Sequence, residues 1–152
     1  MSQTSQIVVA VDGSKQSKLV VDSACKLAKK TSSKLILMYV PPFEDVPEDY
    51  ARYAKQENID MSSYYEGIAN AVLSKFSSQI ESNGLQFESL YEFGNAANEI
   101  LKVAKSRGAD FIVVGLHGLH GIGRIRSLGS VARRVIENAE CDVIVVPTFP
   151  KE

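Results

Sequence analysis

The chain has 152 residues, of which 45% are hydrophobic and 23% are charged, and its formal net charge is −1. This length fits a single domain spanning 1–152, and the composition excludes a disordered chain, a collagen-like repeat and a disulfide-rich scaffold. The near-neutral charge gives no general attraction to nucleic acid or to an anionic membrane, and no apolar run is long enough to span a bilayer.

The N-terminal segment and the cysteines predict a cytoplasmic protein. The sequence MSQTSQIVVAVDGS lacks a basic start, and its apolar run 7–11 is too short for a signal peptide. Cys25 and Cys141 stand in apolar surroundings without a CxxC pair or the spacing of metal ligands. We therefore expect both to be buried thiols in a reducing compartment.

The first half of the chain is predicted to form a strand, a helix and a second strand. Residues 7–11 (IVVAV) predict a buried strand, and the Asp-Gly-Ser that follows predicts a turn that caps a helix starting near Ser14. The apolar face of this helix consists of Val20, Ala24, Leu27 and Ala28. Residues 35–40 predict the second strand, which two prolines end. Residues 43–59 predict a surface excursion, a loop with a short helical turn.

The second half alternates in the same way. Helices are predicted over 61–82, over 95–107 and from Gly129 onward, and strands over 85–91, 111–114 and 143–146. The apolar faces of the first two of these helices are predicted to consist of Ile68, Val72, Phe76 and Ile80, and of Ala96, Ile100, Val103 and Ala104. The last helix carries Val131, Val135 and Ile136. The pattern of strand 85–91 is that of a strand near a sheet edge.

This alternation of strands and helices predicts an α/β fold. We expect a three-layer sandwich, in which helices cover both faces of a five-stranded parallel sheet and the crossovers are right-handed. If the strand order is 3-2-1-4-5, the first and fourth strands are central neighbours. Ligands of such sheets bind beyond the carboxyl ends of the strands, where the strand order reverses.

Residues 115–130 link the fourth strand to the last helix and are rich in glycine. The glycines within nine residues are Gly115, Gly118, Gly121 and Gly123, and Gly129 and Ser130 open the helix. Glycine lets the backbone approach a ligand closely, and a helix N-terminus offers free N–H groups, so the segment suits a phosphate chain. The alternative is a plain loop across the end of the sheet, with Ser127 or Ser130 as an N-cap.

Asp12 and Val40 follow the first and second strands, and we expect them to line the nucleoside end of the same crevice. The alternative for Asp12 is a turn or N-cap carboxylate. The chain has neither G-x-x-x-x-G-K-[ST] nor a G-x-G-x-x-G turn after the first strand, which disfavours dinucleotide binding.

The near-neutral total conceals two segments of opposite charge. Four of the six arginines lie within 124–134, and no acidic residue lies between Asp110 and Glu137. Residues 41–60 hold six acidic side chains and two basic ones. The basic segment favours an anionic ligand, and the acidic segment is a candidate contact region for a partner.

The chain resembles the universal stress proteins of the small, single-domain type. The resemblance rests on IVVAVDGS, on the strand LILMYV and on the G-x-x-G…G-S loop followed by VARRVIENAECDVIVVP, which together span 7–147. It implies an adenine nucleotide alpha hydrolase-like fold. It also implies a homodimer in which the last strand, 143–146, pairs with its copy, and such pairing would cover an exposed apolar edge.

In the ATP-binding branch of that family the loop reads G-x2-G-x9-G-[ST]. Gly115, Gly118, Gly129 and Ser130 match this pattern, whose residues hold phosphates and ribose, and Asp12 and Val40 match positions that contact adenine. Ten residues rather than nine separate Gly118 from Gly129, and we expect Gly121 and Gly123 to absorb the extra one. The predicted nucleotide-binding residues are Val11, Asp12, Val40, Gly115, His117, Gly118, Gly121, Arg124, Gly129, Ser130 and Val131.

The resemblance implies a regulatory or stress-response protein that binds ATP, ADP or AMP, with Mg²⁺, and hydrolyses ATP slowly or not at all. No catalytic base is evident, so we expect at most a weak ATPase. No metal site of the protein's own is expected, because His117 and His120 have no Cys, Asp or Glu nearby in sequence. His117 is expected near phosphate, where its titration would tune affinity with pH.

Two other functions stay open. One is an enzyme of related fold that uses ATP chemically, such as an adenylating enzyme, although the Ser-Gly-Gly loop of the PP-loop class is missing after the first strand. The other is a nucleotide-independent stress module that acts by dimer and partner binding, in which the extra loop residue closes the site.

Overall fold

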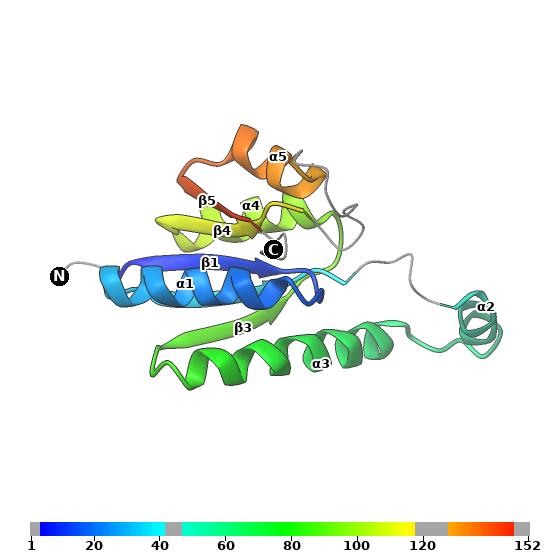
Figure 1. The fold of residues 1–152 in the computed structure, drawn as a ribbon. Helices are drawn as coiled ribbons and strands as arrows, with labels where there is room; N and C mark the ends of the chain where they lie inside the picture. Colours follow the sequence, from blue (N-terminus) through cyan, green and yellow to red (C-terminus); the bar gives the residue numbers. More distant parts are fainter. Residues whose placement is uncertain (1–3, 42–46, 118–127, 148–152) are drawn as a thin grey trace.

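The computed structural model describes residues 4–41, 47–117 and 128–147, and these form a three-layer α/β domain (Figure 1). The strands are β1 (Gln6–Val11), β2 (Lys34–Tyr39), β3 (Phe87–Tyr91), β4 (Phe111–Gly115) and β5 (Asp142–Val146). The helices are α1 (Ser17–Thr31), α2 (Glu48–Gln56), α3 (Ser62–Glu81), α4 (Ala96–Arg107) and α5 (Ser130–Asn138). All strand pairs are parallel and the order is β3-β2-β1-β4-β5, which confirms the predicted fold.

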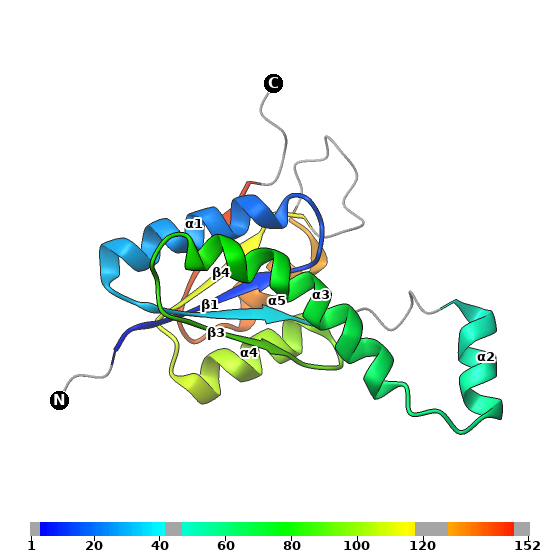
Figure 2. The same cartoon turned by 90° about the horizontal axis from the view of Figure 1, so that it is seen from below.

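The central strand β1 is buried on both faces, which explains its unbroken apolar run. Ile7, Val9 and Val11 point into a core shared with α1 and α3, whereas Val8 points into a second core shared with α4 and α5. Because successive side chains of a strand alternate between faces, one short run supplies both cores. Figure 2 shows the resulting pairs of helices on opposite sides of the sheet.

The buried faces of the helices differ in detail from the predicted ones. In α3, Ala69 and Leu73 are buried together with the predicted Phe76 and Ile80, while Ile68 and Val72 are only partly buried. A strict spacing of four advances about 40° around the helix at each step, so its members drift away from the sheet. The observed spacing of four, three and four stays on one face.

One further inward assignment was wrong by one residue, and the last helix shows how sharply exposure changes between neighbouring residues. In α4, Ala97 is buried beneath the sheet while the predicted Ala96 is half-buried. In α5, Ala132 and Val135 are buried, whereas Ile136 is 43% exposed. A step of one residue turns a helix by about 100°, so a neighbour of a core residue faces a different environment.

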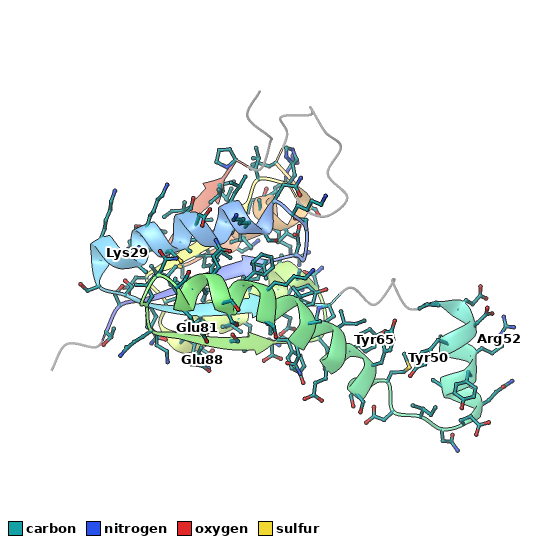
Figure 3. All side chains as sticks on the ribbon, turned by 60° about the horizontal axis from the view of Figure 1, so that its bottom comes forward. Lys29, Tyr50, Arg52, Tyr65, Glu81 and Glu88 are labelled. Atoms are coloured by element: carbon teal, nitrogen blue, oxygen red, sulfur yellow. The ribbon has the colours of Figure 1, made fainter. Side chains whose placement is uncertain are left out.

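The acidic excursion contains a complete helix, α2, rather than a short helical turn. In Figures 1 and 2 it lies apart from the sheet, beyond the N-terminal end of α3. Tyr50 of α2 stacks on Tyr64 of α3 with ring centroids 4.9 Å apart, and Tyr64 meets Tyr65, which in turn meets Phe93. A row of aromatic rings therefore connects α2 to the end of β3 (Figure 3).

The two cysteines are free thiols in different surroundings. Cys25 lies on the buried face of α1, as expected, and burial raises the pKa of its thiol. Cys141 is only partly buried, which corrects the expectation for that residue, because it precedes an edge strand. Within the described ranges, no helix combines the length and apolar character needed to cross a bilayer.

Candidate functional site

A cavity of about 190 Å³ opens at the carboxyl ends of β1, β2 and β4. All eight predicted site residues that the structure describes line it: Val11, Asp12, Val40, Gly115, His117, Gly129, Ser130 and Val131. The other three, Gly118, Gly121 and Arg124, lie outside the described residues. Segments separated by up to 120 positions along the chain thus meet at the predicted edge of the sheet.

Three helices begin at this cavity, because each helix of a parallel α/β sheet runs opposite to its strands. Ser17 of α1, Ala96 of α4 and Ser130 of α5 each belong to a first turn and line the cavity. The first turns of α1 and α5 contain no acidic residue. Gly129, the N-cap of α5, provides no side-chain cap, so N–H groups of that turn remain available to an anion.

Two backbone hydrogen bonds hold the ends of the glycine-rich segment. Leu116 N–H donates to the Val146 carbonyl at 2.8 Å, and Gly129 N–H donates to the Leu116 carbonyl at 2.8 Å. The end of β4 and the start of α5 are therefore joined directly. The positions of Gly115 and Ser130 follow from these bonds rather than from the number of residues between them.

Asp12 is both a turn residue and a cavity residue, so its two interpretations are not exclusive. Its Oδ1 accepts hydrogen bonds from Ser14 N–H at 2.9 Å and from the Ser17 hydroxyl at 2.8 Å. The Asp12 N–H in turn donates to Ser17 Oγ at 3.2 Å. These bonds anchor the carboxylate to the start of α1, beside the cavity.

Gly13 allows the turn that makes this arrangement possible. Its φ of +84° lies in the left-handed region, which other residues adopt only with strain. The chain reverses there from β1 toward α1 and brings Ser14 to the cavity wall. The Asp-Gly-Ser sequence predicted a turn at this place. The positive φ of the turn explains why its middle residue is a glycine.

The cavity has an apolar part and a polar part. Met38, Val40 and Ile100 contribute apolar surface, whereas Asp12, Ser14, Ser17 and Ser130 contribute polar groups. Among the described lining residues Asp12 is the single carboxylate, and none is a lysine or arginine. Such a site suits a ligand with a flat apolar portion and a few hydrogen-bonding groups.

Sequence reasoning missed several cavity residues, and most of them come from helix starts. Ala10, Ser14, Gln16, Ser17, Val20, Met38, Ala96, Ile100, Val114 and Ala132 also line the cavity. Ala96 and Ile100 were interpreted as core residues of a helix facing the sheet. The available signal was the α/β alternation itself, since it places every helix start at the carboxyl edge.

Comparison with known proteins identifies the family. The model of the universal stress protein family matches residues 4–147. A universal stress protein of Methanocaldococcus jannaschii, MJ0531, is 35% identical over 150 residues, which cover 97% of this chain and 84% of that protein. YxiE, a universal stress protein of Bacillus subtilis, is 30% identical and covers 93% and 97% of the two chains.

Solved structures agree with this assignment. A universal stress protein in complex with cAMP is 28% identical and superimposes with a TM-score of 0.66 over 97% of this chain and 99% of that one. An Archaeoglobus fulgidus universal stress protein in complex with dAMP, 24% identical over 96% and 99% of the two chains, gives a TM-score of 0.64. An Arabidopsis thaliana member with AMP bound, 19% identical over 94% and 91%, gives a TM-score of 0.62.

The structure and these comparisons lead to one assignment. The sheet order and the helices around it are those of the adenine nucleotide alpha hydrolase-like fold that the resemblance implied. The family model spans nearly the whole described chain, and the two relatives match over 84% and 97% of their own length. The chain therefore belongs to the universal stress protein family.

Proposed function

We propose that this protein binds an adenine nucleotide, ATP, ADP or AMP, in the cavity at the carboxyl ends of β1 and β4. We further propose that it acts as a regulatory or stress-response protein with slow or no hydrolysis of ATP. The observation that carries the proposal is the convergence of Asp12, Val40, Gly115 and Ser130 on one cavity from four separate segments. The cAMP-bound relative at 28% identity supports the same ligand class.

The residues present fit an adenine nucleotide. The apolar surface of Val40, Met38 and Ile100 suits a purine ring. The Asp12 carboxylate can accept a hydrogen bond from the amino group of adenine. The first turn of α5 and the Ser130 hydroxyl suit phosphate oxygens. When Mg²⁺ accompanies the nucleotide, it neutralises phosphate charge and takes most of its ligands from phosphate and water.

The proposal of low hydrolytic activity rests on the lack of an evident catalytic base among the described cavity residues. Phosphoryl transfer needs cationic groups on the phosphates and a residue that orients the attacking water. Arg124, the predicted cationic residue of the site, lies outside the described residues, and Asp12, the single carboxylate among the described lining residues, is already bonded to Ser14 and Ser17. Turnover of labelled ATP separates this proposal from an ATP-using enzyme, because multiple turnovers per minute would contradict a regulatory role.

The direct test is to denature the purified protein and identify any nucleotide that it releases, and then to titrate the nucleotide-free protein with ATP, ADP and AMP, with and without Mg²⁺. We expect a stoichiometric adenine nucleotide or saturable binding. Ser130→Ala should weaken binding, whereas Ser78→Ala, on the exposed surface of α3, should not. Absence of both released nucleotide and binding at millimolar ATP would overturn the proposal in favour of a nucleotide-independent module.

We also propose that two copies pair along β5. This strand pairs with β4 on one side, and its other side carries no strand among the described residues. Val143, Ile144 and Val145 are partly exposed there, and natural proteins usually cover such an edge. Sedimentation equilibrium should show a dimer for the wild type and a monomer for Val143→Lys, with unchanged circular dichroism.

A cytoplasmic location is part of the same proposal. The thiols of Cys25 and Cys141 are both free, which fits a reducing compartment. Fractionation of cells that produce the tagged protein tests this directly.

A further inference from the structure

We propose that Ser17 is a positioning residue that holds the Asp12 carboxylate so that Oδ2 accepts a hydrogen bond from the 6-amino group of adenine. Ser17 thereby sets the selectivity of the cavity for 6-amino purine nucleotides over 6-oxo purine nucleotides. The inference rests on the proposed function, because it concerns how the same cavity chooses its nucleotide.

Ser17 is one of two buried polar residues among those that the structure describes, the other being Ser33. Its side chain is 2% exposed although it lies in the first turn of α1, where a serine would ordinarily face water. Burial of a hydroxyl is unfavourable unless it is hydrogen-bonded. The position of Ser17 is therefore accounted for by its two bonds to Asp12.

Those two bonds form a closed ring between the residues. The Ser17 hydroxyl donates its single hydrogen to Asp12 Oδ1 at 2.8 Å, while Ser17 Oγ accepts the Asp12 N–H at 3.2 Å. Ser14 N–H donates to the same Oδ1 at 2.9 Å. Rotation of the Asp12 side chain would break two hydrogen bonds to Oδ1, one of them from a buried group.

The ring leaves one carboxylate oxygen for a ligand. Asp12 Oδ2 makes no hydrogen bond to any residue that the structure describes, and Asp12 lines the cavity. An ionised carboxylate accepts hydrogen bonds and cannot donate them. A 6-amino group donates to an oxygen held opposite position 6, whereas hypoxanthine and guanine present an acceptor oxygen there. Their N1–H donor lies one ring position away, and a carboxylate that Ser17 holds in place is kept from shifting to meet it.

The surroundings make this discrimination effective. Val40, Met38 and Ile100 give the neighbouring surface an apolar character, so a mismatched oxygen there finds few alternative partners. A site that hydrogen-bonds a particular ligand group discriminates strongly against an analogue that lacks this group. An apolar pocket discriminates only weakly between ligands that differ by one methyl group. Loosening of Asp12 should therefore reduce selectivity more than it reduces overall affinity.

The test compares binding of ATP and ITP, which differ in the group at the 6-position and in the proton that ITP carries on N1, by calorimetric titration of the wild type and of Ser17→Ala. Ser33→Ala is the matched control, because it removes the other buried serine hydroxyl at the far end of α1. Ser17→Thr retains the hydroxyl and tests rescue. Thermal unfolding and a crystal structure of Ser17→Ala report stability and the Asp12 conformation.

We expect the wild type to prefer ATP over ITP by at least about tenfold and Ser17→Ala to lose most of that ratio. Ser33→Ala should keep the wild-type ratio even if it lowers stability to a similar extent. Equal weakening of ATP and ITP in Ser17→Ala, or an unchanged Asp12 carboxylate in its crystal structure, would overturn the inference. Wild-type protein that binds ATP without preference over ITP would also overturn the inference, but it would leave the proposed function intact. Wild-type protein that binds neither nucleotide would overturn both the inference and the proposed function.

Discussion

Charged side chains form ion pairs at the amino end of the sheet, whereas the carboxylate at the cavity forms none with the described residues. At the amino end, Glu88 of β3 accepts two hydrogen bonds from the Arg107 guanidinium, at 2.6 and 2.9 Å, and a third from Lys34 Nζ at 3.3 Å. Gln6 N–H donates to Asp110 at the same end. Charges from β2, β3 and α4 are thus neutralised within the chain.

At the carboxyl end, Glu99 in the first turn of α4 pairs with Lys102 at 3.4 Å, but the carboxylate that lines the cavity has no such partner among the described residues. Asp12 is held by an N–H and an O–H of its own segment rather than by a cation. Arg133 and Arg134 of α5 are exposed, and neither forms an ion pair with the residues that the structure describes. The helix starts add partial positive charge to this end.

The difference separates a region that stabilises the fold from the region where we propose that a nucleotide binds. Paired charges at the amino end hold β2, β3 and α4 together, whereas at the carboxyl end the first turn of α5 has no side-chain cap and can accept an anionic ligand. Substitutions at the two ends should therefore have separable effects, one on the free energy of unfolding and the other on nucleotide affinity. The following predictions test that separation, from the largest expected effect to the smallest.

Filling the cavity should abolish binding without unfolding the protein. Ala96 is half-buried in the first turn of α4 and lines the cavity, so Ala96→Trp places an indole in the space proposed for the nucleotide. We expect ATP affinity to fall by about two orders of magnitude or more, measured by calorimetry. Ala71→Trp, on the exposed face of α3, is the matched control and should bind ATP normally. Normal ATP affinity in Ala96→Trp would place the ligand elsewhere.

Removing the carboxylate charge at the amino end should lower stability and leave binding unchanged. The Glu88 and Arg107 side chains are 35% and 37% exposed, so solvent screening limits the value of their pair to about 1 kcal/mol. Glu88→Gln should accordingly lower the melting temperature by about 3 °C. Glu81→Gln, an exposed carboxylate at the end of α3 without an ion pair to the described residues, should have no effect (Figure 3). A change in ATP affinity in Glu88→Gln would refute the separation of the two ends.

The same carboxylate should give stability a defined dependence on acid. Hydrogen bonds from Arg107 and Lys34 lower the pKa of Glu88 from 4.5 to about 2. A lowered pKa in the folded state means that the stabilisation is complete above the unfolded value and is lost as the pH falls toward 2. The difference in unfolding free energy between wild type and Glu88→Gln should therefore shrink between pH 4.5 and 2 in urea titrations. A difference that stays constant over this range would show that the ion pair contributes nothing.

Among the variants expected to change ATP affinity, the smallest effect is expected at the N-cap of α4, next to the cavity wall. Asn95 caps α4 through a hydrogen bond from Asn98 N–H to its Oδ1 at 3.0 Å, and α4 carries Ala96 and Ile100 of the cavity. Asn95→Ala should cost about 1 kcal/mol and weaken ATP binding only a few-fold. Asn98→Ala keeps the donating N–H and should leave both quantities unchanged. A loss of binding as large as that in Ala96→Trp would mean that the cap, rather than the wall, positions the ligand.

Much of the site could be predicted because its residues follow strand ends directly. Asp12, Val40 and Gly115 each stand at or next to the last residue of a strand, and parallel strands end at one edge. The helix faces were harder, because an apolar pattern fixes the phase of a helix only to within about one residue. Ala96 and Ile136 illustrate this, since each neighbours a core residue and faces elsewhere.

The sequence by itself determined the strands, the alternation with helices, the resemblance to a family and the edge at which a ligand would bind, because these depend on local pattern and chain order. Only the tertiary structure decided that Ser17 holds Asp12, that Ile100 forms part of a cavity wall and that Glu88 pairs with Arg107. Such contacts depend on strand order and on the direction of side chains. Neither is encoded in the spacing of a single segment, since both arise when separate segments pack against one sheet.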